Sequence, residues 1–187
     1  MNYDAFANSF HKTRYAIWNQ VGLFLDKIPK YASLLDCGCG NGKYAQYKKD
    51  IVYVGNDISL NLLEYASHKS DNILAANGLN LPYLDKIFDY SMSIAVLHHI
   101  DNHEKRKQFI NELVRVTRNK ILISVWAQEQ EIKPNWINIS GSDYLIPWQN
   151  KHLRYYHLFS KKELEELCSG LKYEIFFERD NWYVLLG

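Results

Sequence analysis

Residues 34–42 read Leu34-Leu35-Asp36-Cys37-Gly38-Cys39-Gly40-Asn41-Gly42, an apolar run that ends in glycines at every second position. Glycine lets the backbone turn sharply and approach a ligand without a Cβ atom in the way. The apolar run predicts a short buried strand over 32–37, and the residues after the glycines predict a helix around 44–49. A strand, a glycine turn and a helix in this order are typical of α/β folds that bind a small ligand.

The spacing of the glycines separates two kinds of ligand. A nicotinamide-binding turn needs its third glycine three residues after the second, but that position holds Lys43. An acid two residues before the first glycine matches enzymes that bind S-adenosylmethionine. Since this cofactor has no pyrophosphate, Asp36 can hold its methionine amino group instead. We therefore expect S-adenosylmethionine to bind to Asp36, Gly38, Cys39, Gly40 and Gly42. The alternative is a glycine turn with stray acids and no ligand.

Two further strand ends extend this site. Asp57 ends a strand predicted over 51–56, 21 residues after Asp36, and its carboxylate can accept hydrogen bonds from both ribose hydroxyls. Asn77 follows a short strand, where an acid usually accepts from the adenine amino group. An amide oxygen accepts that bond without charge, so we expect weaker cofactor binding rather than none. The remaining cofactor-binding positions are Ile58, Gly78 and Ala95.

Strands and helices alternate along the first two thirds of the chain. Helical periodicity is found at residues 17–28, before Pro29, at 59–66, behind a Ser59 cap, and at 103–118. Besides those already named, strands are predicted at 72–76, 88–95 and 121–126. Such alternation implies right-handed crossovers and a parallel sheet with helices on both faces.

The last third of the chain has a different pattern. Residues 127–158 carry many aromatic side chains with little periodicity, which predicts a structured loop region on the substrate side. Ser160 and Glu163 form a capping box for a final helix. Strands predicted at 173–177 and 182–186 form a hairpin that turns at Asp180-Asn181.

These elements predict a Rossmann-like α/β fold of the class I methyltransferases. We expect one domain over 1–187, with a seven-stranded, mostly parallel sheet, helices on both faces and a C-terminal β-hairpin. The first 30 residues form an N-terminal helical segment in this interpretation.

Composition excludes several classes of protein. The net charge of +1 gives no overall field that would attract nucleic acid, so RNA binding would need a local basic patch. Three cysteines are too few for a disulfide framework, and Cys37-x-Cys39 lacks partner ligands, so we expect no metal. The sequence has neither a signal peptide nor an apolar run of membrane-spanning length. We expect a cytoplasmic protein with no membrane partner.

Several longer blocks go beyond a generic methyltransferase. They are Thr13-Arg14-Tyr15 with Trp18, Ser93–Ile100, Ile123–Gln130, Tyr144–Trp148, Arg154–Phe159 and Arg179–Tyr183. With these blocks the chain resembles, almost end to end, the eukaryotic tRNA wobble-uridine carboxyl methyltransferases. The same domain also occurs in animals fused to an AlkB-type dioxygenase. This chain departs from the family at Asn77 and in a much shorter stretch between Gln130 and Asp143.

The resemblance implies a reaction and two partners. Such enzymes methylate the carboxylate of 5-carboxymethyluridine at the wobble base of tRNA and form the methyl ester. They usually need a small zinc-binding activator subunit, with which this chain would form a heterodimer. A strand at 72–76 would lie at an open sheet edge guarded only by Asp71, and we expect the activator to dock there. The alternative is that so short an edge needs no guard.

The chemistry needs no general base, because a carboxylate with a pKa of about 4 is already ionised at neutral pH. It needs groups that align an anion and strip its water. We predict His98, Arg154 and His157 for this role, with no metal. Predicted substrate or RNA contacts are Arg14, Trp18, Trp126, Tyr155, Tyr156, Arg179 and Asn181. The alternatives are a structural role for His98 and simple packing for about half of the aromatic side chains.

A local basic surface supports RNA binding. Residues 151–162 contain Lys151, Arg154, Lys161 and Lys162 but no acid, and Lys12, Arg14 and Lys105-Arg106-Lys107 would extend that surface. Such clusters are often only a solvated face. Two other functions stay open: a small-molecule O- or carboxyl methyltransferase of the same fold, and a non-catalytic binding module, which Asn77 alone favours.

Overall fold

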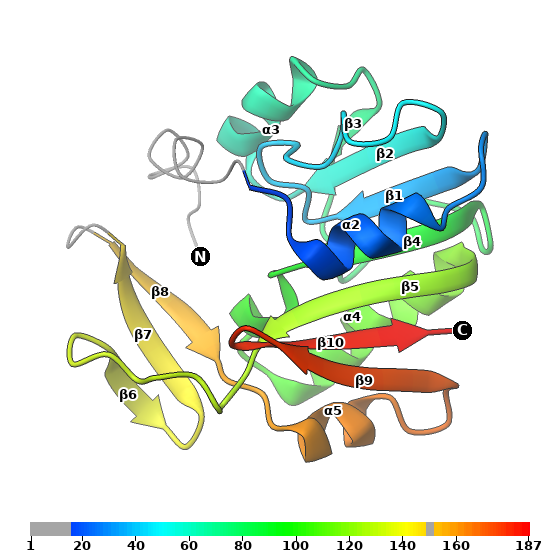
Figure 1. Ribbon diagram of the computed structural model, residues 1–187. Helices are drawn as coiled ribbons and strands as arrows, with labels where there is room; N and C mark the ends of the chain where they lie inside the picture. The colour runs from blue at the N-terminus through cyan, green and yellow to red at the C-terminus, as the bar shows by residue number, and fades with distance from the viewer. Residues whose placement is uncertain (1–15, 149–151) are drawn as a thin grey trace.

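The computed structural model describes residues 16–148 and 152–187, in which a large sheet carries a smaller one at its side (Figure 1). The seven strands of the large sheet lie in the order β3-β2-β1-β4-β5-β10-β9. They are β1 Ser33–Cys37, β2 Val52–Asp57, β3 Ile73–Ala75, β4 Phe88–Ile94, β5 Thr117–Trp126, β9 Tyr173–Glu178 and β10 Asn181–Leu186. Strands β1 to β5 pair in parallel, and β10 is antiparallel to both β5 and β9. The predicted class I methyltransferase sheet is confirmed.

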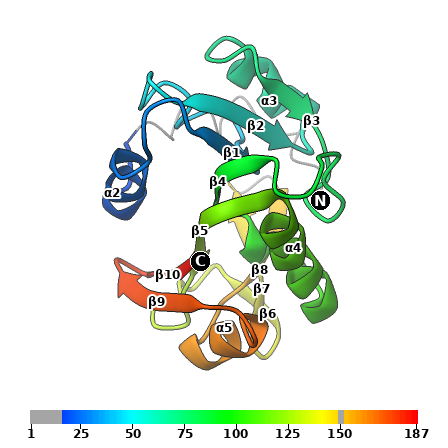
Figure 2. The same ribbon diagram turned by 90° about the vertical axis from the view of Figure 1, so that its right-hand side faces the viewer.

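Helices cover both faces of this sheet (Figure 2). They are α2 Asn19–Asp26, α3 Leu60–Ser67, α4 His103–Val116 and α5 Lys161–Leu167, with a short 3-10 turn η2 at Leu97–His99. On one face, α4 and α5 pack Phe109, Ile110 and Leu164 against the sheet. On the other face, α2 packs Val21 and Leu25. The core therefore lies on both sides of the sheet, as parallel sheets require.

The predicted helix starts are confirmed by their caps. The Ser59 hydroxyl accepts from the Leu62 N–H at 3.3 Å, and the Ser160 hydroxyl accepts from the Glu163 N–H at 3.2 Å. A further cap comes from Asn102, whose side-chain oxygen accepts from the Glu104 and Lys105 N–H groups of α4. Each cap satisfies N–H groups that the helix itself leaves without acceptors.

The helix predicted around residues 44–49 is wrong, because residues 41–47 form successive turns. Their backbone bonds span three residues, as in Ala45 N–H to Gly42 O at 3.2 Å and Tyr47 N–H to Tyr44 O at 3.1 Å. Gly40 and Gly42 both have positive φ, at 54° and 67°. Left-handed backbone at these positions is incompatible with continuous right-handed helix, so the chain turns without building one.

The loop region predicted over 127–158 contains a three-stranded antiparallel sheet that we did not predict. Its strands are β6 Ile137–Ser140, β7 Asp143–Trp148 and β8 His152–His157, in the order β6-β7-β8. One face carries Tyr144, Trp148 and Tyr156, while the other carries charged and hydroxyl groups such as Asp143. Because bulky side chains occur on both faces, the sequence shows no clean alternation of apolar and polar residues.

The terminal hairpin is confirmed, but its turn lies one residue earlier than predicted. The two turn residues are Arg179 and Asp180, with φ of 46° and 64°. Positive φ at both positions is the signature of the type I′ turn, which matches the twist of the flanking strands. Asn181 is therefore the first residue of β10, and its side chain donates to the Arg179 carbonyl at 2.7 Å.

Two absences apply to residues 16–148 and 152–187. None of the helices there has the length and apolar character needed to cross a membrane. That same part of the chain also contains no group of three or more histidine, cysteine, aspartate or glutamate side chains placed to hold a metal ion.

Candidate functional site

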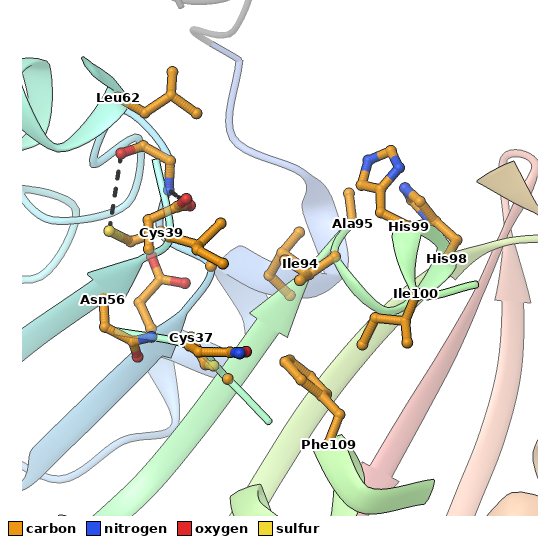
Figure 3. A pocket seen from close by; sticks show the side chains of 18 of the residues that line it. Cys37, Cys39, Asn56, Leu62, Ile94, Ala95, His98, His99, Ile100 and Phe109 are labelled. Carbon is orange, nitrogen blue, oxygen red and sulfur yellow. Dashed lines mark hydrogen bonds between the residues drawn. The ribbon is translucent and has the colours of Figure 1, made fainter. Parts of the chain in front are cut away.

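A cavity of about 400 Å³ opens where the parallel strands end at their carboxyl sides. This is where open α/β sheets bind ligands, and the volume is that of a pocket for a small molecule. In Figure 3, Cys37, Cys39 and Asn56 lie on one side of the cavity, and His98, His99 and Ile100 lie on the other. The predicted residues that line it are Trp18, Asp36, Gly38, Cys39, Gly40, Asp57, Ile58, Asn77, Gly78, Ala95, His98, Trp126, Arg154 and Tyr156.

The glycine turn forms the floor of the first half of this cavity. Gly38 has φ of 81°, and a Cβ there would lie 2.3 Å from the Val96 side chain. The N–H groups of Gly38 and Cys39 both donate to the Asn56 carbonyl, at 2.7 and 2.9 Å. Gly42 does not line the cavity; a Cβ there would meet Ala66 of α3 at 3.1 Å. The first glycine is therefore needed for the turn itself, and the last for packing against α3.

Asp57 hydrogen-bonds to the backbone that follows β1 and to the backbone that follows β2. One carboxylate oxygen accepts from the Gly40 N–H at 2.8 Å, and the other accepts from the Ser59 N–H at 2.9 Å. Because a carboxylate oxygen has two lone pairs, an oxygen that accepts from the turn can also accept from a ligand hydroxyl. The expected ribose contact at Asp57 fits this geometry.

Asp36 lies deeper, with only 1% of its surface exposed. The Tyr53 hydroxyl donates to one of its oxygens at 2.7 Å. Burial raises the pKa of Asp36 to about 7, although the Tyr53 hydrogen bond works in the opposite direction. A buried carboxylate of this kind in a cavity wall favours a cationic ligand group, such as the ammonium group of the cofactor's methionine part.

The side chain of Lys43 stands beside this carboxylate. Its ammonium group lies 5.0 Å from the centre of the Trp18 ring and 4.8 Å from that of Tyr44. These distances are within the range of cation–π attraction. Lys43 lines the cavity, although at the level of the sequence it counted only as evidence against a nicotinamide site. Its position directly after the last glycine could have identified it as a site residue.

The two cysteines of the glycine turn have no reactive character. Both Cys37 and Cys39 are buried, and burial raises the pKa of each thiol far above its usual value. Since the thiolate is the nucleophile and the metal ligand, these side chains serve as small apolar groups in the cavity wall.

Asn77 lines the cavity, but its side-chain oxygen already has a donor. It accepts from the Leu79 N–H at 3.0 Å and closes a local turn. One lone pair of that uncharged oxygen remains for the amino group of adenine, while the amide NH₂ cannot accept from it. An aspartate would have a second oxygen available for that contact.

We expect Asn77→Asp to tighten cofactor binding about fivefold, because a charged acceptor replaces a donor and contributes about 1 kcal/mol. Titration calorimetry with S-adenosylhomocysteine would measure this change. Asn119→Asp, a substitution of the same kind on β5 and outside the cavity, is the control. A clear loss of affinity in Asn77→Asp would mean that this residue does not face the adenine.

The second half of the cavity is aromatic. Tyr156 stacks on Trp126 with ring centres 4.3 Å apart, and on His98 at 5.0 Å. Trp136, at the far end of the stack, lies 5.5 Å from Trp126 and nearly parallel to it. The stack forms a rigid apolar wall with flat surfaces, which suits an unpaired base.

Arg154 crosses this wall from β8. It is 3% exposed, and its guanidinium lies over the Trp148 ring at 4.4 Å and over the Tyr156 ring at 5.0 Å. A planar cation stacked between aromatic faces is held in one orientation. The cavity therefore has a fixed positive charge in its aromatic half and carboxylates in its glycine half.

The two histidines are fixed by backbone groups. Because a backbone N–H only donates, the His98 Nδ1 accepts from Trp126 at 3.2 Å, and in the neutral ring Nε2 carries the proton. The His99 Nδ1 faces the Tyr155 carbonyl at 2.9 Å and therefore donates. Both rings line the cavity. His99, which was not among the predicted site residues, therefore also belongs to the site.

Tyr155 and His157 do not line the cavity; they belong to a charged cluster behind it. His157 contacts Asp143 through Nδ1 at 2.5 Å and Glu163 through Nε2 at 2.8 Å. The Tyr155 hydroxyl donates to Asp143 at 2.6 Å and accepts from Arg106 at 2.9 Å. The cluster, made of Arg106, Asp143, Tyr155, His157 and Glu163, joins α4 and α5 to the small sheet.

Ionisation of Asp143 in this cluster is favoured. Burial works against the charge on Asp143, but hydrogen bonds from Tyr155 and His157 hold its pKa below the usual value. His157 contacts one carboxylate through each ring nitrogen, which fixes the orientation of its ring. The cluster is thus a structural support for β8, which carries Arg154 and Tyr156 into the cavity.

The predicted basic surface is largely neutralised where the structure describes it. Lys105 pairs with Asp101 at 3.1 Å, Lys161 with Glu165 at 3.5 Å and Lys162 with Glu166 at 3.9 Å. Arg106 belongs to the buried cluster. Arg179 lies in the terminal turn and Asn181 begins β10, and neither residue lines the cavity. Lys12, Arg14 and Lys151 lie outside the described residues.

Comparisons with known proteins agree with this geometry. Residues 35–123 match the family described as "Methyltransferase domain". A tRNA (carboxymethyluridine(34)-5-O)-methyltransferase of Schizosaccharomyces pombe is 34% identical, over 98% of this chain and 92% of its own length. The protein of the same name from Saccharomyces cerevisiae is 31% identical, with the same two coverages. That from Arabidopsis thaliana is 42% identical over 78% of this chain, but this chain spans only 37% of its length.

Solved structures share the fold at low identity. A putative methyltransferase in complex with the Haloferax volcanii Trm112 methyltransferase activator has a TM-score of 0.73 at 15% identity, covering 99% of this chain and 95% of its own. The DhpI-SAM-HEP complex has a TM-score of 0.75 at 14% identity, covering 99% of this chain and 94% of that one.

Proposed function

Because this chain belongs to the tRNA (carboxymethyluridine(34)-5-O)-methyltransferase family, we propose that it methylates the carboxylate of 5-carboxymethyluridine at the wobble position of tRNA. The methyl donor is S-adenosylmethionine, and the product is the methyl ester. The observation that carries this proposal is a single cavity with carboxylates at its glycine end and Arg154 at its aromatic end.

The chemistry follows from this division of charge. The bound cofactor supplies a methyl group on a positively charged sulfur. Asp36 and Asp57 would hold the ammonium and ribose ends of that molecule. Arg154 holds the substrate carboxylate, and Tyr156 or Trp126 stacks on the base. Since the carboxylate is already ionised, these residues only have to align it and exclude water.

A transfer assay on matched RNA hairpins tests this function. Two anticodon stem-loops would differ only in a wobble 5-carboxymethyluridine or uridine, and the methyl group of the cofactor would carry a radioactive label. We expect label only in the hairpin with the carboxylate. Equal labelling of both hairpins, or labelling of small carboxylic acids in preference to the RNA, would replace this substrate with another.

Arg154→Ala should lower the rate of methyl transfer to the carboxymethylated hairpin by at least about tenfold. The reason is the loss of one charge-assisted contact to the carboxylate, worth about 1.4 kcal/mol. Arg154→Lys should recover little of the loss, because lysine cannot stack flat between Trp148 and Tyr156.

The control for this substitution is Lys162→Ala, which removes an exposed cation of α5 outside the cavity. It should leave the rate within about twofold of normal. Cofactor affinity, measured by titration calorimetry, should barely change in any of the three variants. A normal methylation rate in Arg154→Ala would make this arginine a packing residue.

A small activator subunit is the proposed partner, docked on β3. This strand lies at the open edge of the large sheet, as predicted, and Leu74 on it is 42% exposed. An exposed apolar edge strand invites pairing with a strand of another chain. The Haloferax volcanii complex supports this proposal, because its methyltransferase has the same fold and is bound to an activator.

Leu74→Lys should disrupt that complex by placing a charge in the buried contact. Size-exclusion chromatography of the co-expressed pair would show the loss of the heterodimer, while Lys107→Leu on the exposed side of α4 should leave it intact. If the isolated chain is monodisperse and fully active without an activator, the edge is simply too short to need cover.

The proposed setting is the cytoplasm. Cys37, Cys39 and Cys168 are all buried free thiols, which suits a reducing compartment.

A further inference from the structure

The buried pair formed by Asp36 and Tyr53 lies behind the cofactor half of the cavity. Leu34 pairs with Tyr53 in the register of β1 and β2, so Asp36 and Tyr53 point to the same face of the sheet, two residues apart. Asp36 is 1% exposed and Tyr53 is 6% exposed. The Tyr53 hydroxyl donates to the Asp36 Oδ2 at 2.7 Å. Only Asp36 of this pair lines the cavity.

We propose that Tyr53 is a positioning residue that makes cofactor uptake depend on the ionisation of Asp36. Its hydroxyl fixes one oxygen of the carboxylate and leaves the other for the ammonium group of the cofactor. The inference rests on the proposed cofactor site, which it deepens: the cationic end of the cofactor binds only the ionised form of Asp36, so uptake releases a proton.

The surroundings of Asp36 explain why its carboxyl group titrates near neutral pH. Burial disfavours the carboxylate, the Tyr53 hydroxyl favours it, and the negative charge of Asp57 disfavours it again. Lys43 is the nearby cation that favours it. Cys37 and Cys39 stay neutral thiols, and on the β4 side the neighbour in register is Met92, which does not titrate. The result is a pKa of about 7 for Asp36.

The sign of the effect follows from linkage. An ammonium group that binds the carboxylate lowers the pKa of Asp36 in the complex. Affinity therefore rises with pH up to about 7, by about tenfold per pH unit where the free acid is protonated and the bound one is not. Above about pH 8 the α-amino group of the ligand loses its own proton, and affinity should fall again.

A comparison of two ligands distinguishes the effect of Asp36 from that of the other cavity residues. S-adenosylhomocysteine carries the ammonium group, whereas 5′-methylthioadenosine has the same nucleoside without the amino-acid part. Titration calorimetry between about pH 5.5 and 8.5 should give a rising limb for the first ligand only. In two buffers of different ionisation enthalpy, the first ligand should release close to one proton at about pH 6, and the second none.

Tyr53→Phe removes the hydrogen bond that favours the ionised form and leaves the ring in place. The rising limb for S-adenosylhomocysteine should therefore move to higher pH, with affinity about tenfold below that of the unaltered chain at about pH 6 and within about twofold of it at about pH 8. Tyr183→Phe, at a second buried tyrosine that does not line the cavity, is the matched control and should leave the limb in place.

Each other outcome has one meaning. A flat profile for S-adenosylhomocysteine in the unaltered chain, or the same limb for both ligands, would overturn the inference while leaving the cofactor site standing. An equal shift in Tyr53→Phe and Tyr183→Phe would also overturn it. If neither ligand binds at any pH, the proposed function fails with it.

Discussion

Asp57→Ala should weaken the binding of S-adenosylhomocysteine by at least about 100-fold. The substitution removes the acceptor for the Gly40 and Ser59 N–H groups as well as the expected ribose contact. Loss of charge-assisted hydrogen bonds of this kind costs about 3 kcal/mol, and each 1.4 kcal/mol is about tenfold in affinity. Titration calorimetry on the purified chain measures the change directly.

Asp57→Asn is the graded control for this substitution. It keeps the shape and one oxygen acceptor but loses the charge, so its affinity should fall between those of the unaltered chain and Asp57→Ala. Circular dichroism should show that all three proteins are folded. Unchanged affinity in Asp57→Ala would remove the basis for a cofactor site at this turn.

Arg106→Met should lower the free energy of unfolding by about 3–5 kcal/mol. The side chain of Arg106 is 5% exposed and contacts Glu163 at 3.3 Å, Asp143 at 3.7 Å and the Ile100 carbonyl at 2.9 Å. Its removal leaves two partly buried carboxylates without their shared arginine, and breaking a buried ion pair on one side carries a cost of about this size.

Urea denaturation followed by tryptophan fluorescence would measure the loss. Lys107→Met, the next residue on α4, is exposed and should change stability by less than about 0.5 kcal/mol. Because Arg106 does not line the cavity, S-adenosylhomocysteine should bind Arg106→Met normally under native conditions. Equal stability of the two variants would mean that the cluster does not hold the small sheet.

The large sheet was predictable because its signals are local. Apolar runs such as 88–95 and caps such as Ser59 extend over only a few residues. Each predicted the bounds of one strand or helix to within a few positions. The helix around 44–49 was predicted wrongly because Gly42, just before its predicted start, has a positive φ that a right-handed helix does not allow. The small sheet was missed because bulky side chains occur on both of its faces, so β7 and β8 lack the alternation of apolar and polar residues that predicts a strand.

The candidate site shows the same division. Asp36, Asp57 and Asn77 could be named because each lies at or just after the carboxyl end of a strand, where the sheet faces its ligand. Their hydrogen-bond partners could not be named from the sequence. That the Tyr53 hydroxyl donates to Asp36 and the Leu79 N–H donates to Asn77 follows only from the directions of the side chains in the structure. His157 and Arg154 are neighbours on β8, but three residues apart on a strand they point to opposite faces, so one faces the cluster and the other the cavity.

Mass spectrometry of the wobble nucleoside tests the central claim most directly. The purified chain, alone and with its activator, would be incubated with S-adenosylmethionine and tRNA that carries 5-carboxymethyluridine. We predict that this nucleoside is replaced by its methyl ester and returns when the tRNA is treated with mild alkali, because an ester hydrolyses there. Unchanged 5-carboxymethyluridine in the presence of bound cofactor and activator, or a new methyl group that survives alkali, would contradict transfer to the carboxylate.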